Sequence, residues 1–370
     1  MAKVDNKKTT GRISRRSMFQ FAGTVAAGGL AAPAIARAQA PDVSWRMATS
    51  WPKNLPGPGV TAQRICDQIE RLSGGRMRVK LLAAGELVPA LGVFDAVSNG
   101  TVQVGHTASF FWQGKTPASV FFTAVPFGLL PSEHMTWIEQ GGGQGLWDEL
   151  YAPFGIKPVM AGNTGFQMGG WFKPEIGNLG DLQGLKIRMP GLGGEVMRRL
   201  GATPVSLPPG ELYQALQSGV LDAAEFLGPW SDRAMGFQRA TKNYYAPGFH
   251  EPNGTGEALF NIEALEALPE DLQAVVLEAC RAENALSLTE SEWENAGSLR
   301  LLQDEDGVVI RTYPDEVLNA LRATSADVLA EFAEKGGIGA RIYESYRSAQ
   351  DRLGPWSEIS LRQFLSARSG

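Results

Sequence analysis

Hydrophobic and polar positions alternate in two distinct ways along this chain, and the two periods predict strands that alternate with helices. Residues 43–48 alternate apolar and polar side chains, as a half-buried strand does, and residues 77–81 repeat that pattern. Between them, residues 60–72 carry apolar side chains at helical spacing. Another helix is expected at about 90–98 and another strand at 102–105. This alternation favours a parallel α/β sheet.

The same alternation returns in the second half of the chain and predicts a second α/β unit. Strands are expected at 157–160, 165–172, 185–188, 203–205 and 223–226, with helices at 192–200 and 210–218. A long helical region from about 269 to 298 follows, and Pro314 is placed to open a further helix. Two α/β series and a helical C-terminal region favour two lobes over one continuous sheet. The expected fold class is therefore a two-lobed α/β protein.

The first residues predict an export signal. Ser14–Phe19, with Arg15 and Arg16, resembles a twin-arginine motif, and a short apolar stretch follows it. Ala36-Arg37-Ala38 supplies the small residues that signal peptidase reads, so residues 1–38 are expected to be removed on export to the periplasm. A membrane anchor is the alternative, although the apolar stretch is short, glycine-rich and interrupted by proline.

Charge and cysteine usage narrow the function class. The 370 residues carry a net charge of −5, yet the first 40 hold seven basic residues and one acidic residue, so the remainder carries −11. An acidic body argues against a general nucleic-acid-binding protein. Cys66 and Cys280 lie far apart and near none of the three histidines, so no zinc cluster is predicted. Both cysteines are expected to be small buried apolar residues.

Local motifs of enzymes are incomplete or missing. Gly114-Lys115-Thr116 resembles the end of a phosphate-binding loop but lacks the earlier glycine, because Ser109 stands in its place. The sequence has neither a Gly-x-Ser-x-Gly nor a His-Glu-x-x-His motif. A catalytic site assembled from distant residues stays open on this ground alone.

Arg188 is the first candidate binding residue. It ends a short apolar strand and is followed by a proline and a glycine, and strand ends are where α/β folds bind ligands. A planar guanidinium can hold a carboxylate through two parallel hydrogen bonds. The alternative from spacing alone is a surface ion pair.

Segments around Arg188 resemble the solute-binding proteins of TRAP (tripartite ATP-independent periplasmic) transporters. The resemblance covers nearly the whole chain after the export signal, and its most specific segments are 185–190, 200–205, 211–222 and 224–225. It implies two α/β lobes around a cleft, ligand capture by hinge closure, and a strand-end arginine, Arg188, that grips a carboxylate. One lobe is expected at 41–165 plus about 255–294, the other at 166–254 plus about 295–340, and a helical tail at 341–368.

A narrower resemblance is to the branch of this family that binds 2-oxo acids (alpha-keto acids) together with a metal ion. Residues 49–53, 162–171 and 244–252 carry it. It implies a sodium or calcium ion held by Gln167, Glu225, the backbone carbonyl of Phe226, and Glu251. The branch usually has a larger or hydroxyl-bearing aromatic residue at the Phe226 position, so the size of the ligand stays open.

Charge supports a metal independently of the resemblance. Glu225, Glu251 and an anionic ligand would place three negative charges beside the single cation of Arg188, and burial makes such an imbalance unfavourable. An oxygen-ligated cation would remove it, and oxygen ligands suit a hard ion such as sodium or calcium. Apolar walls are expected from Trp51, Trp112 and Phe226, with ordinary core packing as the alternative for each.

The resulting functional hypothesis is a non-catalytic periplasmic binding protein. It would capture a small monocarboxylate, a 2-oxo acid such as pyruvate, and deliver it to a membrane permease. The aromatic and apolar residues of the tail need a partner surface. The resemblance to the 2-oxo-acid branch implies a homodimer through this tail, and packing onto the tail's own lobe is the alternative. Alternative ligands are lactate, an aromatic acid or a sugar alcohol. The alternative activity is a lyase or hydrolase with Glu225 or Glu251 as general base.

Overall fold

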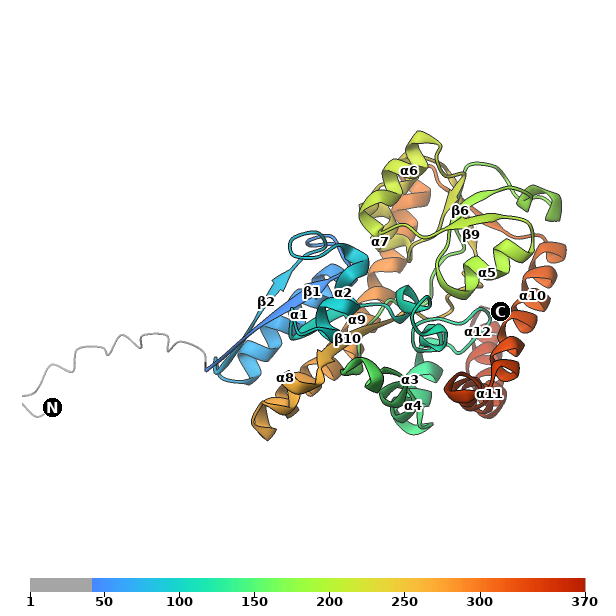
Figure 1. The fold of residues 1–370 in the computed structure, drawn as a ribbon. Helices are drawn as coiled ribbons and strands as arrows, with labels where there is room; N and C mark the ends of the chain where they lie inside the picture. The colour runs from blue at the N-terminus through green and yellow to red at the C-terminus, as the bar shows by residue number, and fades with distance from the viewer. Residues whose placement is uncertain (1–41, 370) are drawn as a thin grey trace, which may run out of the picture. The chain divides into compact units, whose positions relative to one another are not determined.

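Two mixed β-sheets organise the chain in the computed structural model, which describes residues 42–369 (Figure 1). The expected export signal at residues 1–38 lies outside the described residues. The two-lobed α/β class predicted from the sequence is confirmed, because each sheet carries its own strands and helices.

The first sheet has five strands in the order β2-β1-β3-β10-β4. In that order the strands span Met77–Leu82, Val43–Thr49, Val104–Thr107, Thr255–Asn261 and Ile156–Asn163. Strands β1, β2 and β3 are parallel, whereas β10 runs antiparallel to both β3 and β4.

The second sheet has six strands in the order β11-β9-β5-β8-β6-β7. They span Val309–Thr312, Asn243–Ala246, Gly170–Phe172, Ala223–Ala224, Lys186–Arg188 and Thr203–Val205. Strand β6 is parallel to β7 and β8, and β11 is parallel to β9, while β5 is antiparallel to its two neighbours.

The prediction of parallel sheets is therefore wrong for one strand of each sheet. The chain leaves the first sheet after β4, builds most of the second sheet, and returns as β10, so β5 and β10 are the strands that follow each crossing. The spacing of hydrophobic residues indicates that a segment is a strand, but it does not indicate whether the strand runs parallel or antiparallel to its neighbours. The strand expected over 165–172 is also shorter than predicted, because residues 164–169 belong to the crossing segment.

Helices cover both sheets. In chain order α1 to α12 span Pro58–Leu72, Val93–Ser98, Pro131–Gln140, Gly143–Tyr151, Gly191–Arg199, Leu212–Ser218, Pro229–Met235, Ile262–Glu266, Glu270–Asp304, Asp315–Lys335, Gly337–Ser357 and Gln363–Ser369. The predicted helix that opens after Pro314 is confirmed as α10, and the long helical region is α9.

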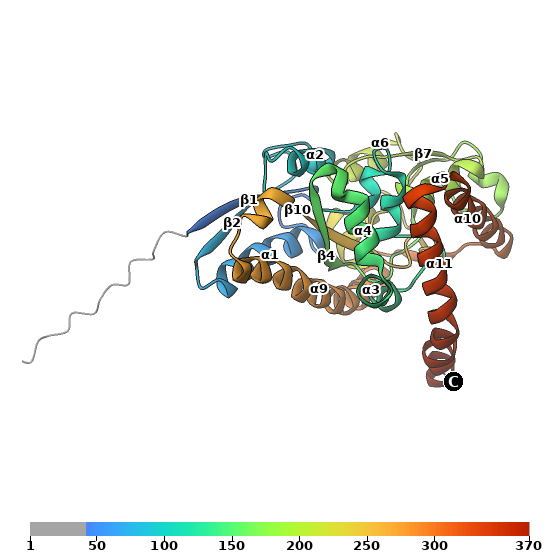
Figure 2. The same cartoon turned by 60° about the horizontal axis from the view of Figure 1, so that its bottom comes forward.

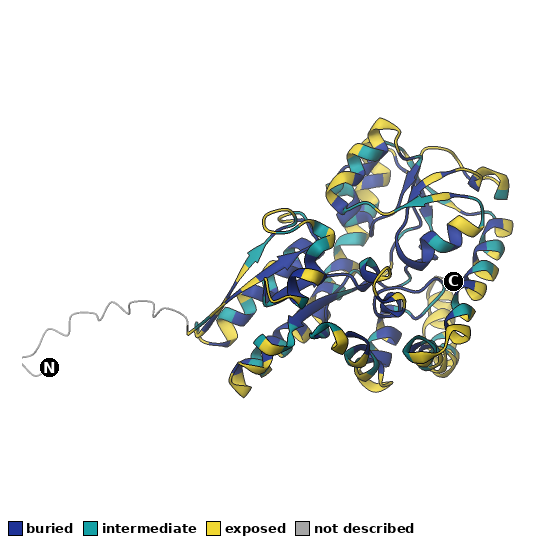
Figure 3. Ribbon diagram, in the orientation of Figure 1, coloured by how far each residue is buried: buried dark blue, intermediate teal, exposed yellow. Residues whose placement is uncertain are grey.

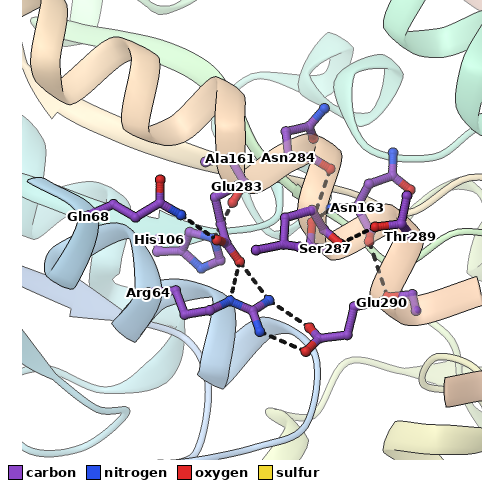
Figure 4. A network of polar contacts seen from close by, with 12 residues as sticks. Arg64, Gln68, His106, Ala161, Asn163, Glu283, Asn284, Ser287, Thr289 and Glu290 are labelled. Atoms are coloured by element: carbon purple, nitrogen blue, oxygen red, sulfur yellow. Dashed lines mark hydrogen bonds and ion pairs between the residues drawn. The ribbon is translucent and has the colours of Figure 1, made fainter. Parts of the chain in front are cut away.

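Helix α9 connects the two sheets. It packs against β4 and α1 on the side of the first sheet and against α7 on the side of the second (Figure 1). Arg64 of α1 donates to Glu283 at 2.7 Å and to both oxygens of Glu290, at 2.7 and 2.6 Å, which ties α1 to α9 (Figure 4). Because the Glu283 side chain is fully buried, this ion pair is shielded from solvent on one side.

Buried residues are concentrated between the sheets and their covering helices (Figure 3). One core cluster joins the first sheet to α1 and α9 and includes Met47, Ile65 and Val276. Cys66 and Cys280 are free and lie in the same cluster, as the sequence predicts. Burial raises the pKa of the Cys66 thiol to about 12, so this thiol is unreactive at neutral pH.

The C-terminal helices leave the core progressively. The first half of α11 is anchored by Ile342 and by Tyr346, whose hydroxyl accepts a hydrogen bond of 2.7 Å from the backbone N–H of Leu129. From Asp351 to Ser369 no residue is buried, and Figure 2 shows this part extending from the body. Across the described residues, no helix combines the length and the apolar character that crossing a membrane requires.

Glu257 on β10 is a carboxyl group inside the core of the first sheet. Its Oε1 accepts from Trp112 Nε1 at 2.8 Å and its Oε2 accepts from the Tyr151 hydroxyl at 3.2 Å. Burial is the main cause that raises its pKa from 4.5 to about 8. The folded protein therefore keeps a proton on Glu257 that the unfolded chain releases above about pH 4.5.

The substitution Glu257→Gln is expected to remove this pH dependence. Because the folded-state pKa is raised, the wild type loses stability as the pH rises from about 4.5 to about 8, by at most about 1.4 kcal/mol per pH unit. The variant should match the wild type near pH 4.5 and exceed it increasingly up to pH 8, as measured by urea unfolding. An equal dependence of both proteins on pH would show that folding does not raise the pKa of Glu257.

Candidate ligand and cation site

A pocket lies where the chain crosses between the sheets. It holds about 560 Å³ of space not filled by atoms, part of which is open to solvent. Five of the residues singled out in the sequence line it, namely Trp51, Gln167, Arg188, Phe226 and Glu251. The charged and amide side chains among them come from the second sheet and the crossing segments, whereas Trp51 follows β1 of the first sheet.

Two crossing segments, 164–169 and 247–254, bring Gln167 and Glu251 together. The backbone N–H of Thr164 donates to the carbonyl of Gly254 at 2.9 Å, which holds the segments side by side. Gly254 is required here, because a Cβ atom at this position would lie 2.1 Å from Thr164 Oγ1 and 2.3 Å from Gln167 Nε2. The two segments can therefore approach closely enough to share one site.

Arg188 and Glu225 form a buried ion pair at the ends of neighbouring strands. The register of β6 and β8 places Arg188 opposite Ala224, so Glu225 follows at the edge of the sheet. Arg188 Nη1 donates to Glu225 Oε1 at 2.5 Å and to the Glu225 carbonyl at 2.8 Å. Only 2% of the Arg188 side chain and none of the Glu225 side chain is exposed. Arg188 thus faces the pocket and not bulk solvent.

Oxygen acceptors surround this pair. Gln167 Nε2 donates to Thr164 Oγ1 at 3.0 Å, whereas its Oε1 is buried and has no hydrogen-bond partner among residues 42–369. Glu251 is buried, and its pKa is raised well above the usual value, first by burial and then by the charge of Glu225. Arg188 opposes that shift only in part. The site therefore offers more oxygen acceptors than donors.

This donor set fits a hard cation. Atoms of Glu225, His250 and Glu251 that can bind a metal lie within 4.8 Å of one another, and all three residues are buried. The two carboxylates and the orphaned Gln167 Oε1 are oxygen ligands of the kind that sodium and calcium prefer. With both glutamates ionised, the cluster carries one negative charge in excess of Arg188, which a bound cation would neutralise.

Aromatic side chains form another part of the pocket lining. Trp51 Nε1 donates to His106 Nδ1 at 2.8 Å, and His106 Nε2 lies 3.0 Å from the carbonyl of Ala161. Since the indole N–H donates to Nδ1, the His106 proton is on Nε2, and burial lowers the pKa of His106 to about 4. The only side-chain donor of Trp51 is therefore used within the protein. Phe110 and Phe111 line the same wall.

Trp112 is the predicted wall residue that the structure does not bring to the pocket. It is buried in the core of the first sheet, where its indole N–H bonds Glu257. The residues that line the pocket do not include it. Its aromatic character and its place one residue from Phe111 do not distinguish a core side chain from a wall side chain.

Three buried polar residues of the site were missed in the sequence: His106, His250 and Asp232. Asp232 on α7 accepts from the Leu227 N–H at 3.0 Å, from Trp171 Nε1 at 2.9 Å and from the Tyr244 hydroxyl at 2.7 Å. It thereby fixes the segment that follows Glu225. The position of His250 directly before Glu251 is the one local signal that could have indicated it; Asp232 has none.

We expect an added cation to stabilise the protein more at pH 8 than at pH 5. Because the pKa of Glu251 is raised, a cation must displace its proton at low pH but not above that pKa. The check is the rise in Tm on adding calcium chloride at pH 5, 6.5 and 8.

Glu251→Gln should show a much smaller rise at every pH, while the exposed Glu263→Gln control should behave as the wild type. A larger rise at pH 5 than at pH 8 in the wild type would contradict the assigned competition between proton and cation.

The comparisons with known proteins agree with this geometry. Residues 47–335 match the family model DctP, described as bacterial extracellular solute-binding protein, family 7. A monocarboxylate 2-oxoacid-binding periplasmic protein of Nostoc sp. is 41% identical over 331 residues, which cover 88% of this chain and 90% of that protein.

Two solved structures of TRAP solute-binding proteins have the same fold. The protein of Pseudoalteromonas atlantica, with bound sodium and pyruvate, is 38% identical with a TM-score of 0.85 and covers 88% of this chain and 98% of its own. The protein of Bordetella bronchiseptica is a mixed-occupancy dimer with copurified calcium and picolinate; it is 36% identical with a TM-score of 0.86 and covers 89% of this chain and 100% of its own. The resemblance found in the sequence is confirmed: this chain belongs to family 7 of the bacterial extracellular solute-binding proteins, the binding proteins of TRAP transporters.

Proposed function

We propose that this protein captures a small 2-oxo acid such as pyruvate, together with a sodium or calcium ion, for delivery to a membrane permease. The observation that carries the proposal is the buried guanidinium of Arg188, which lines a pocket beside two glutamates and an unpartnered amide oxygen. The carboxylate would bind Arg188, and Gln167, Glu225, the Phe226 carbonyl and Glu251 would hold the cation.

Charge supports a monocarboxylate over a dicarboxylate. Arg188 is the only lysine or arginine among the described residues that line the pocket, and Glu225 already pairs with it. A second carboxylate on the ligand would add a negative charge to a pocket whose described lining has no further lysine or arginine, which burial makes unfavourable. The ligands named for the two solved relatives, pyruvate and picolinate, are monocarboxylates.

The size of such a ligand limits its affinity. A pyruvate-sized acid has about six heavy atoms, and a ceiling near −1.5 kcal/mol per atom gives roughly −9 kcal/mol, or a Kd of a few tenths of a micromolar at best. Each polar atom must then be matched. The cation would supply a further partner, for the keto oxygen.

A second candidate ligand is an aromatic acid, and one position favours it. The ring of Phe226 lies 5.9 Å from Arg188 Cζ, so this side chain forms the wall next to the carboxylate site. The branch that this chain resembles usually has a larger or hydroxyl-bearing aromatic residue at this position, so phenylalanine would leave more room for the ligand. The lyase or hydrolase alternative is set aside, because the family consists of binding proteins.

Export and assembly complete the proposal. Residues 1–38 would direct the chain to the periplasm by the twin-arginine route, and residues 41–165 with about 255–294 would form the lobe that closes on 166–254 with about 295–340. The apolar side chains of the tail would pair two copies: Trp356, Ile359, Leu361, Phe364 and Leu365 are all exposed.

Arg188→Met is expected to weaken pyruvate binding by at least about 30-fold, because it removes one partner of a buried charge pair. The pyruvate affinity of Arg188→Lys should fall between those of Arg188→Met and the wild type, since lysine keeps the charge but not the planar guanidinium group. Calorimetric titration with pyruvate and with longer 2-oxo acids, with and without calcium, measures both effects.

The exposed Arg198→Met on α5 is the matched control, and it should bind as the wild type does. Undiminished binding by Arg188→Met would overturn the assignment, and so would a wild type that binds no carboxylate in either ionic condition.

For the tail, Trp356→Glu combined with Phe364→Glu is expected to give a monomer, because charges would then lie in the apolar contact. Sedimentation velocity measures the mass, and Leu87→Glu, at another exposed apolar position, is the control. A monomeric wild type would remove the tail from the assembly proposal.

A further inference from the structure

His250 is a buried polar residue to which neither the family resemblance nor the proposed ligand set assigns a role. Its side chain is 1% exposed, and its Nε2 lies 3.0 Å from Glu225 Oε2. Its Nδ1 is buried and has no hydrogen-bond partner among the residues that the structure describes. A polar ring fully enclosed in this way requires a reason.

The partners of the ring decide its tautomer. Glu225 is already paired with Arg188 through Oε1, so its carboxylate accepts and does not donate. The contact with Oε2 therefore needs a proton on His250 Nε2. Because Nδ1 has no acceptor among the described residues, Nε2–H makes the one side-chain hydrogen bond of the ring there.

His250 thus supplies the contact that completes the orientation of Glu225. The Glu225 backbone N–H and carbonyl both bond Arg188, and Oε1 bonds Arg188 as well. Oε2 is bonded only to His250 among the described residues. Each carboxylate oxygen has a further lone pair, and these lone pairs remain available beside Glu251.

The fold makes room for this ring with a glycine. A Cβ atom on Gly193, in the first turn of α5, would lie 2.6 Å from His250 Cβ and 3.0 Å from Met189 Sδ. The first turn of α5 therefore packs directly against the base of the His250 side chain. Gly193 therefore has a specific packing role beside His250.

We propose that His250 is a positioning residue, whose Nε2–H holds the Glu225 carboxylate in the orientation that binds the cation. The inference rests on the cation of the proposed function and goes beyond it, because His250 does not contact the ligand in this arrangement. Hydrogen bonds from such outer residues to metal-binding groups commonly change metal affinity by about 10- to 100-fold.

The test compares the wild type with His250→Leu, which removes the donor, and His250→Gln, whose amide nitrogen can replace Nε2. Calcium affinity is measured directly, as the calcium dependence of Tm without organic ligand, and again as the calcium dependence of pyruvate binding by calorimetry. His250→Leu should lose about 10- to 100-fold in calcium affinity, and His250→Gln should regain most of it.

A purely structural role would give a different result. If His250 acts through the cation site, saturating calcium should restore pyruvate affinity in His250→Leu, because mass action compensates a weaker cation site. Gly193→Ala, which crowds the base of the His250 side chain, should resemble His250→Leu. Gly145→Ala, where a Cβ atom meets nothing within 4 Å, should resemble the wild type.

The outcomes separate the two proposals. A wild type that binds neither calcium nor sodium overturns the cation of the proposed function. If the wild type binds calcium, three results would overturn the role of His250 alone. They are a calcium affinity of His250→Leu equal to that of the wild type, a loss in His250→Gln as large as in His250→Leu, and no recovery of pyruvate affinity in His250→Leu at saturating calcium.

Discussion

The buried ion pair of Arg188 and Glu225 is the interaction on which the site depends. Two charges removed from water are tolerated only when each is fully paired, and here the pairing is built into the sheet. Strands β6 and β8 are in register, so the Glu225 backbone and side chain both bind Arg188. The guanidinium is held in place before any ligand arrives, which lowers the entropic cost of binding an anion.

The remaining polar groups of the site come from segments that cross between the sheets. Gln167 and Glu251 lie on the two crossings, and Asn163 at the end of β4 bonds Asn253 of the second crossing at 2.8 Å. The Asn163 N–H also donates to Ser287 Oγ on α9 at 2.8 Å (Figure 4). Anything bound to the oxygen cluster therefore contacts the same segments that connect the two sheets, which is where a hinge motion would act.

The sequence predicted the parts of the molecule that local pattern determines. The helix after Pro314, strand β7 and the strand that ends at Arg188 follow from short-range periodicity and turn residues. The direction of β5 and β10 did not follow, because it is set by crossings between sheets that periodicity does not record.

Gln167 and Glu251 were indicated only through the family resemblance, since nothing local predicts that residues 84 positions apart share a pocket. His106, His250 and Asp232 were missed and Trp112 was misplaced for a related reason: whether a buried polar or aromatic side chain faces a core or a cavity depends on its neighbours in space.

The hydrogen bond from Trp51 to His106 has a consequence for selectivity. With its indole N–H used inside the protein, the aromatic wall can sort ligands only by their shape, whereas the arginine and the oxygen cluster recognise the acidic end. One methylene group in an apolar site changes binding by about 1–3 kcal/mol, far less than the loss of a matched charge. Such a site would discriminate strongly at the acidic end of the ligand and only weakly at the other end. It would therefore bind a series of related acids with graded affinities and not a single compound.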